Sequence, residues 1–315
     1  MEKNQVVDPM QFPRYEGIRT FMRLPNSRNL EKLDFAIVGL PYDTCASFRV
    51  GTRFGPSSIR EISPLNKRYH PVLDVDIFDI CKGVDYGDLM TVPGYIEESF
   101  DEIEKGMKEI FQAGVIPIAM GGDHSVTLPE LRACSKVHGP VALVHFDSHC
   151  DTWKEYYGKP YNHGTPFYYA AKEGCIAGSK SIQVGIRGGL YSKEGTRLSK
   201  ELGMTVLPAV KCHKMEPEEV VKKIKETVGN SKVFLTFDID FLDPSFAPGT
   251  GTPEIGGFST AYALEVLRGL KELDIVGYDV VEVAPQYDHG EITSFAAAHI
   301  MFEFMAQIAW RKERK

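Results

Sequence analysis

Short runs of apolar, largely β-branched residues recur along the chain and are separated by longer amphipathic stretches. Nearly continuous apolarity over so few residues is typical of strands that are buried on both faces, as in a parallel sheet. The pattern therefore predicts a buried parallel sheet. Its expected strands are DFAIVGL from residue 34, VIPIAM from 115, VALVHFD from 141, SIQVGIR from 181, VFLTFDID from 233 and IVGYDVVEV from 275.

Three of the intervening stretches show the period of an amphipathic helix. Apolar positions recur at helical spacing in residues 96–114, and Gly114 is placed to end that helix. A second helix is expected from Pro217, a favourable first-turn residue, to Gly229, and a third around residues 264–270. Alternating strands and helices form right-handed βαβ units. We therefore expect an α/β fold with three α/β/α layers around a mostly parallel sheet.

Composition gives no reason to divide the 315 residues into several domains. Glycine and proline are spread along the chain, and neither low-complexity segments nor repeats stand out. With 43% hydrophobic residues the chain can bury one large core. We expect an N-terminal extension over residues 1–33, followed by a single domain over residues 34–315.

The net charge and the N-terminal sequence limit the kinds of partner and the cellular location that we expect. The net charge of −7 and the lack of a Lys/Arg block argue against nucleic acid and anionic membranes as partners. The opening MEKNQVVDPMQFPRYEG lacks the features of a secretory signal, and no uninterrupted apolar run approaches the roughly 18 residues of a membrane span. The six cysteines are scattered, without a CxxC pair, and are expected to be reduced thiols. These features predict a cytoplasmic protein.

Charged residues cluster where four of the expected strands end. GGDHS (121–125) follows VIPIAM, FDSHCD (146–151) ends VALVHFD, DIDFLDP (238–244) ends VFLTF, and Glu282 closes IVGYDVVEV. Ligands of parallel α/β sheets bind beyond the carboxyl ends of the strands. We therefore expect these clusters to meet in one cleft.

The residue types in these clusters indicate metal binding. Side chains alternate along an extended strand, so Asp147, His149 and Asp151 are expected to share one face, with Ser148 and Cys150 on the other. Asp238, Asp240 and His124 complete a set of four carboxylates and two imidazoles. Buried together without partners, such carboxylates would repel one another and most would have to protonate. Two divalent cations would balance their charge.

The donor set also suggests the metal and its chemistry. Oxygen and imidazole donors without thiolate favour Mn²⁺, with Ni²⁺, Co²⁺ or Fe²⁺ as alternatives, over a structural zinc site. Two such ions about 3.5 to 4 Å apart can share a water and lower its pKa. The sequence thus predicts a hydrolase.

The ordered motifs GGDHS, FDSHCD, HGTPF and FDIDFLDP resemble those of the ureohydrolases, the arginase and agmatinase family. The resemblance extends from about Ala36 to about Met305 and implies an arginase-like fold, with the catalytic domain over residues 34–315. It also implies a binuclear manganese enzyme that releases urea from a guanidino compound and assembles as a homotrimer or homohexamer. One departure is Ser148, where many members have alanine, and it is expected to face away from the ligands.

The resemblance further implies a role for each residue of the motifs. The metal ligands would be His124 and Asp151 on one ion, His149 and Asp240 on the other, and Asp147 and Asp238 as bridges. His163, in YNHGTPF, matches the histidine that passes a proton to the leaving amine. An imidazole on a loop suits this role because it can gain and lose a proton near neutral pH. Glu282 matches the carboxylate that binds the guanidinium, and Asp151 would also hold or pass a proton.

The loop WKEYYGKPYNHGTPF (153–167) is similar to that of the agmatinase branch, so agmatine, a small cationic substrate, is the expected compound. Its products would be putrescine and urea. Guanidinobutyrate and guanidinopropionate are alternatives. Each carries a carboxylate and would need a cation in the pocket. Arg49, Arg53, Lys154 or Lys159 could supply one.

Other interpretations remain open for the function and for single residues. A deacetylase or amide hydrolase of related fold would use a single zinc, and a catalytically silent polyamine-binding protein would release no urea. Glu282 could pair with Arg187 instead of a substrate, and Asp243 suits a turn. His145 is expected to face away from the metals.

Overall fold

The computed structural model describes residues 10–190, 192 and 194–314 and has at its centre an eight-stranded sheet. The strand order is β4-β1-β5-β10-β9-β6-β7-β8, and every neighbouring pair is parallel. The expected α/β fold with a mostly parallel sheet is confirmed. The strands are β1 (Phe35–Gly39), β4 (Gly83–Asp88), β5 (Ile116–Met120), β6 (Ala142–Phe146), β7 (Ile182–Ile186), β8 (Thr205–Pro208), β9 (Val233–Asp238) and β10 (Ile275–Val281). A separate antiparallel pair consists of β2 (Tyr69–His70) and β3 (Val75–Asp76).

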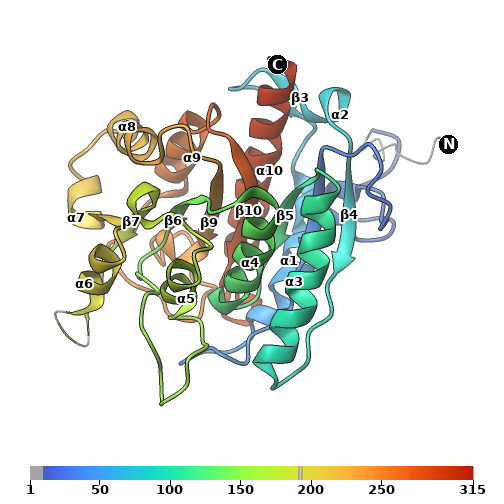
Figure 1. The fold of residues 1–315 in the computed structure, drawn as a ribbon. Coiled ribbons are helices and arrows are strands. Elements are labelled where there is room, and N and C mark those ends of the chain that lie inside the picture. Colours follow the sequence, from blue (N-terminus) through green and yellow to red (C-terminus); the bar gives the residue numbers. More distant parts are fainter. Residues whose placement is uncertain (1–9, 191, 193, 315) are drawn as a thin grey trace.

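Helices cover both faces of the sheet (Figure 1). One face packs on α3 (Ile96–Gln112), α4 (Thr127–His138) and α5 (Pro166–Lys172). The other face packs on α1 (Gly55–Ile62), α2 (Ile77–Ile80), α7 (Ala209–Cys212), α8 (Pro217–Val228), α9 (Thr260–Gly269) and α10 (Ile292–Glu313). Helix α6 (Glu194–Glu201) precedes the edge strand β8. The apolar side chains thus form two cores, one on each face of the sheet.

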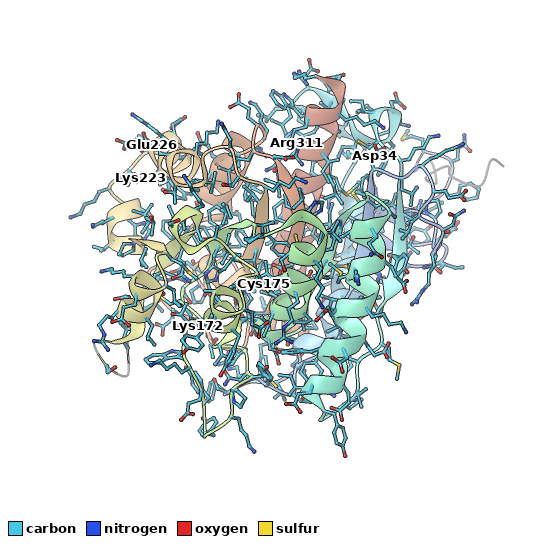
Figure 2. The ribbon with its side chains drawn as sticks, in the orientation of Figure 1. Asp34, Lys172, Cys175, Lys223, Glu226 and Arg311 are labelled. Atoms are coloured by element: carbon cyan, nitrogen blue, oxygen red, sulfur yellow. The ribbon has the colours of Figure 1, made fainter. Side chains whose placement is uncertain are left out.

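The helices predicted from periodicity are present. Helix α3 ends just before Gly114, which has a φ of 72° that favours glycine. Helix α8 begins at Pro217 behind a capping box that Glu216 and Glu219 form. Its outward face carries Lys223 and Glu226, as Figure 2 shows, while its apolar residues enter the core.

Helix α10 is long and apolar enough to span a membrane by length and composition alone. In the fold, however, 83% of its most apolar stretch is buried inside the protein. Its apolar surface contacts α1, α2 and α9 in the core. The helix is therefore a central element of the packing.

Part of the expected N-terminal extension belongs to the same core. Phe21, Met22 and Leu24 are buried, and the backbone N–H of Phe21 donates to Asp85 Oδ2 at 2.8 Å. Asp85 is a buried residue of the edge strand β4. The segment before β1 therefore packs against the β4 edge of the sheet.

Candidate metal centre and active site

Four strands that lie next to one another in the sheet deliver the candidate residues. In the order β5, β10, β9, β6, their carboxyl ends lead to His124, Glu282, Asp238 and Asp147. These ends point to the lower side of Figure 1. As expected, the charged clusters lie together at the carboxyl ends of these central strands.

The first group of metal donors surrounds the imidazole of His124. Its Nδ1 lies 3.1 Å from Asp147 Oδ2, 3.0 Å from Asp151 Oδ2 and 3.2 Å from Asp238 Oδ2, and it has no well-aligned hydrogen-bond partner among the described residues. The other nitrogen, Nε2, lies 3.0 Å from the hydroxyl of Thr236. Burial lowers the pKa of His124, but the three adjacent carboxylates raise it well above its usual value. The site thus attracts a positive charge, and a metal ion fits there.

A second group lies beside the first and shares one residue with it. His149 Nδ1 lies 3.1 Å from Asp240 Oδ2 and 3.5 Å from Asp147 Oδ1. Asp147 therefore directs one carboxylate oxygen to each group. Asp238 directs Oδ2 to His124, whereas its Oδ1 accepts a hydrogen bond from the backbone of Asp240 at 2.8 Å. Such a two-part donor set exceeds what a single-zinc hydrolase needs.

The carboxylates of this edge repel one another. Burial raises the pKa of Asp238 well above its usual value, and the charges of Asp240 and Asp147 raise it further. Burial opposes the ionisation of Asp147, but His145 and His124 hold the pKa of that carboxyl well below its usual value. Divalent cations would relieve this repulsion, because they neutralise the carboxylates without protonating them.

The chain does not stay extended after β6, so the expected alternation of Asp147, His149 and Asp151 along a strand was wrong. The expected orientations of Ser148 and His145 were also wrong. The strand ends at Phe146, and Asp151 has a φ of 48°, in the left-handed region. The backbone N–H of His149 donates to Asp147 Oδ1 at 2.5 Å, which turns the chain at this point. The three donors converge because of this turn and not because of alternation along a strand.

Ser148 faces the ligands, contrary to expectation. Its hydroxyl donates to Asp240 Oδ1 at 2.8 Å and lies 3.1 Å from His149 Nδ1. Its backbone N–H donates to the same Asp240 oxygen at 3.1 Å. The turn after Asp147 brings it there, and Ser148 therefore orients two candidate ligands.

His145 also lies on the side of the metal donors, contrary to expectation. Its Nε2 lies 2.7 Å from Asp147 Oδ2, and its ring centroid lies 5.2 Å from that of His124. The physical reason is the two-residue period of the strand, which puts residues 145 and 147 on one face.

His163 and Glu282 form a second functional unit beside the metal donors. His163 Nδ1 lies 3.1 Å from Glu282 Oε1. Its Nε2 lies 2.7 Å from the hydroxyl of Ser47 and accepts from the backbone N–H of Ser47 at 3.0 Å. Ser47 thus offers Nε2 a donor when the ring is neutral and an acceptor when it is protonated. Burial lowers the pKa of His163, but Glu282 raises it to about 9.

Glu282 retains one free carboxylate oxygen. Oε1 accepts from His163 and, at 2.9 Å, from the backbone N–H of His124, whereas Oε2 is buried and no residue in the described part of the chain donates to it. Arg187, the alternative partner, instead donates to the backbone carbonyls of Asp240 and Glu254 at 2.6 and 2.9 Å. Asp243 accepts the backbone N–H groups of Gly256 and Gly257, in keeping with a turn. Glu282 is therefore available for a cationic group.

Sequence reasoning missed Asp123, which supports the loop after β5. It accepts the backbone N–H groups of Cys45 at 3.0 Å and Ser125 at 3.1 Å. Burial raises its pKa to about 7, with a further contribution from the charge of Glu282. Its position beside His124 in GGDHS was the only available signal. Cys45 and the other five cysteines form no disulfide in the structure.

A cavity of about 450 Å³ opens onto both units. Its deep wall contains His149, Asp151, Asp238, His163 and Glu282. The more exposed part of its lining is largely aromatic and contains Phe48, Trp153, Tyr156 and Tyr157, and Glu254 also lines the cavity.

Comparison with known proteins gives similarity over nearly the whole chain. A family model described as the arginase family matches residues 33–307. A guanidinopropionase of Pseudomonas aeruginosa is 39% identical over 97% of this chain and 96% of its own. An agmatinase of Neisseria meningitidis is 47% identical over 90% of this chain and 91% of its own. A crystal structure described as a hypothetical agmatinase from Burkholderia thailandensis has a TM-score of 0.89 and 40% identity, covering 95% of this chain and 93% of that one.

Proposed function

Because this chain belongs to the arginase family, and is therefore a hydrolase acting on the carbon–nitrogen bonds of linear amidines, we propose that its substrate is agmatine. Hydrolysis would consume one water and yield putrescine and urea. We further propose that two Mn²⁺ ions take part, with Ni²⁺, Co²⁺ or Fe²⁺ as alternatives. The homotrimer or homohexamer and the cytoplasmic location remain predictions.

The lining of the cavity is the observation that carries the choice of agmatine. Among the described lining residues Arg187 is the only lysine or arginine, and both terminal nitrogens of its guanidinium donate to backbone carbonyls. A guanidino acid would present a carboxylate to this wall and would need a cation there. Agmatine presents an ammonium group, which suits the aromatic rings and Glu254.

The positions of the four cationic residues considered from the sequence also favour agmatine as the substrate. None of them is among the described residues that line the cavity. Arg49 stacks on the rings of Phe48 and Tyr287, and Arg53 is bound to Asp43. Lys159 lines a neighbouring hollow, and Lys154 lines neither.

The donor groups fit two divalent ions. His124 and Asp151 would hold one, His149 and Asp240 the other, and Asp147 and Asp238 would contribute to both; Asp147 already directs an oxygen to each group. When bound, the ions would lower the pKa of a shared water and balance the carboxylates.

The remaining steps belong to side chains of the chain itself. Glu282 Oε2 accepts the N–H donors of the guanidinium and holds its carbon at the deep wall. Asp151, also on that wall, takes up the proton that the attacking water loses. His163 gives a proton to the departing amine, and its hydrogen bonds to Ser47 and Glu282 orient the ring.

The test is release of urea from agmatine, arginine, guanidinobutyrate and guanidinopropionate by the Mn²⁺-loaded protein. We expect kcat/KM for agmatine to exceed the others by about 10-fold or more, the size of one well-placed charge interaction. The second candidate is a guanidino-acid hydrolase, which the full-length similarity to a guanidinopropionase favours. A higher kcat/KM for guanidinopropionate than for agmatine would establish that candidate instead.

A further inference from the structure

His145 is fully buried among the candidate metal ligands but has no role in the proposed reaction. It lies on β6 with its Nε2 2.7 Å from Asp147 Oδ2, and its ring packs on Phe167 at a centroid distance of 4.4 Å. With His124 and Asp147 it forms a group of donors close enough to hold an ion. Its proton therefore decides its role, because a ring nitrogen that carries hydrogen cannot bind a metal.

Gln183, on the neighbouring strand β7, fixes that proton. It is paired with His145 in the sheet, and its amide nitrogen lies 3.0 Å from His145 Nδ1 and 2.6 Å from the carbonyl oxygen of Cys150. A carbonyl oxygen only accepts hydrogen bonds, so the amide nitrogen of Gln183 must face Cys150. The same nitrogen then donates to His145 Nδ1. The ring proton is therefore on Nε2 and points at Asp147 Oδ2.

The burial of the Gln183 amide also lowers the stability of the fold. Gln183 is fully buried in β7 between Ile182 and Val184, and its amide oxygen accepts no hydrogen bond from the residues that the structure describes. An amide in an apolar sheet destabilises the fold unless its hydrogen bonds compensate. Both donor hydrogens of Gln183 serve the segment that carries the metal donors, which gives this residue a function beyond packing.

We infer that Gln183 and His145 form a buried clamp that positions the carboxylate of Asp147, and that His145 is not itself a ligand. The inference rests on the proposed metal centre. Asp147 directs Oδ2 to His124 and Oδ1 to His149, so rotation of this one carboxylate would disturb both groups. The clamp holds Oδ2 through His145, and the backbone N–H of His149 holds Oδ1. Groups that orient metal ligands typically change metal affinity by about 10- to 100-fold when they are removed.

The first experiment needs no metal and takes its result from the wild-type protein. Nitrogen-15 NMR of the histidine-labelled, metal-free wild-type protein reports which ring nitrogen of His145 carries the proton, and the spectrum of His145→Gln assigns the signal. We expect the Nε2–H form. The Nδ1–H form would overturn the clamp.

The second experiment measures Mn²⁺ affinity by competition with a chelator. Gln183→Met and His145→Phe keep the shape but lose the donors, and we expect affinity to fall by about 10- to 100-fold. His145→Gln should restore affinity to within about 3-fold of wild type, because its amide nitrogen reaches the position of Nε2. Val184→Ala is the matched control, since Val184 is buried in the same strand and lies in the core on the other face. It should lower the melting temperature and leave Mn²⁺ affinity unchanged.

The outcomes separate the clamp from the metal centre. Wild-type affinity in both Gln183→Met and His145→Phe would overturn the clamp. A wild-type protein that binds no Mn²⁺ would overturn the proposed metal centre, and the NMR experiment would then still decide the tautomer of His145.

Discussion

His163 Nδ1 lies 3.1 Å from Glu282 Oε1, although the two residues are 119 positions apart in the chain. This hydrogen bond joins the residue proposed to protonate the leaving amine to the one proposed to bind the guanidinium. Because Oε1 is engaged by His163 and by the backbone of His124, Oε2 is the oxygen available to a substrate. Binding of the guanidinium and the protonation state of His163 are therefore coupled through one carboxylate.

His163→Phe should leave the metal centre loaded but slow turnover. A general acid or base typically contributes about 10² to 10⁴ in rate, so we expect kcat to fall by that factor. The measurement is steady-state urea release together with metal content by elemental analysis. Wild-type kcat in this variant would remove His163 from the reaction.

Glu282→Gln should weaken substrate capture. A hydrogen bond to a charged group contributes about 1.5 to 3 kcal/mol, so kcat/KM for agmatine should fall by about 10- to 150-fold. Initial rates or progress curves of urea release at agmatine concentrations below KM give kcat/KM directly. An unchanged kcat/KM would assign Glu282 a structural role.

The same variant should alter how stability depends on pH. Burial lowers the pKa of His163, but Glu282, with further contributions from the charges of Asp123 and Asp151, raises it from 6.5 to about 9 in the folded protein. A raised pKa stabilises the folded state fully below pH 6.5, and this contribution is lost as pH rises through about 9. Urea unfolding of the metal-free protein should therefore show a smaller loss of stability across this range in Glu282→Gln than in wild type. Equal losses in the two proteins would contradict the pKa shift.

Asp147→Ala should abolish binding of two metals per chain, because Asp147 supplies an oxygen to each donor group. Elemental analysis after gel filtration in dilute Mn²⁺ measures the stoichiometry. Asp101→Ala, which removes an exposed aspartate of α3, is the matched control and should bind as wild type does. Two ions per chain in Asp147→Ala would refute the shared role.

Ser148→Ala should weaken Mn²⁺ binding only modestly. The hydroxyl donates to Asp240 Oδ1, but the backbone N–H of the same residue donates to that oxygen as well. Loss of one hydrogen bond costs about 1 kcal/mol, so we expect an affinity loss of about 5-fold. Chelator competition can resolve this difference, and a loss beyond about 100-fold would mean that the hydroxyl does more than orient Asp240.

The sequence was sufficient to place the catalytic edge of the sheet. Four apolar runs ended in charged motifs, and β5, β10, β9 and β6 are indeed neighbours. Strand β4 was not foreseen because Asp85 interrupts its apolar pattern. Arg60 satisfies that buried carboxylate with hydrogen bonds of 2.8 and 2.9 Å, and this partner comes from α1. Such a pairing between distant elements leaves no periodic signal in the sequence.

Within the site, residue types were easier to predict than orientations. His145 could have been placed correctly by the two-residue period that relates it to Asp147. Ser148 could not, because its orientation follows from the turn that begins when Asp147 accepts the backbone N–H of His149. That turn depends on one side-chain hydrogen bond and not on any pattern of apolar residues.

The position of β10 in the middle of the sheet has a consequence for synthesis of the protein. Strand β10 lies between β5 and β9, so the chain preceding it cannot bring His124 beside Asp238 by pairing those two strands directly. A growing chain must therefore release nearly all of its residues from the ribosome before the metal donors can assemble. Metal capture then reports a completed fold, and a truncated chain that lacks β10 would present carboxylates without the geometry to retain an ion.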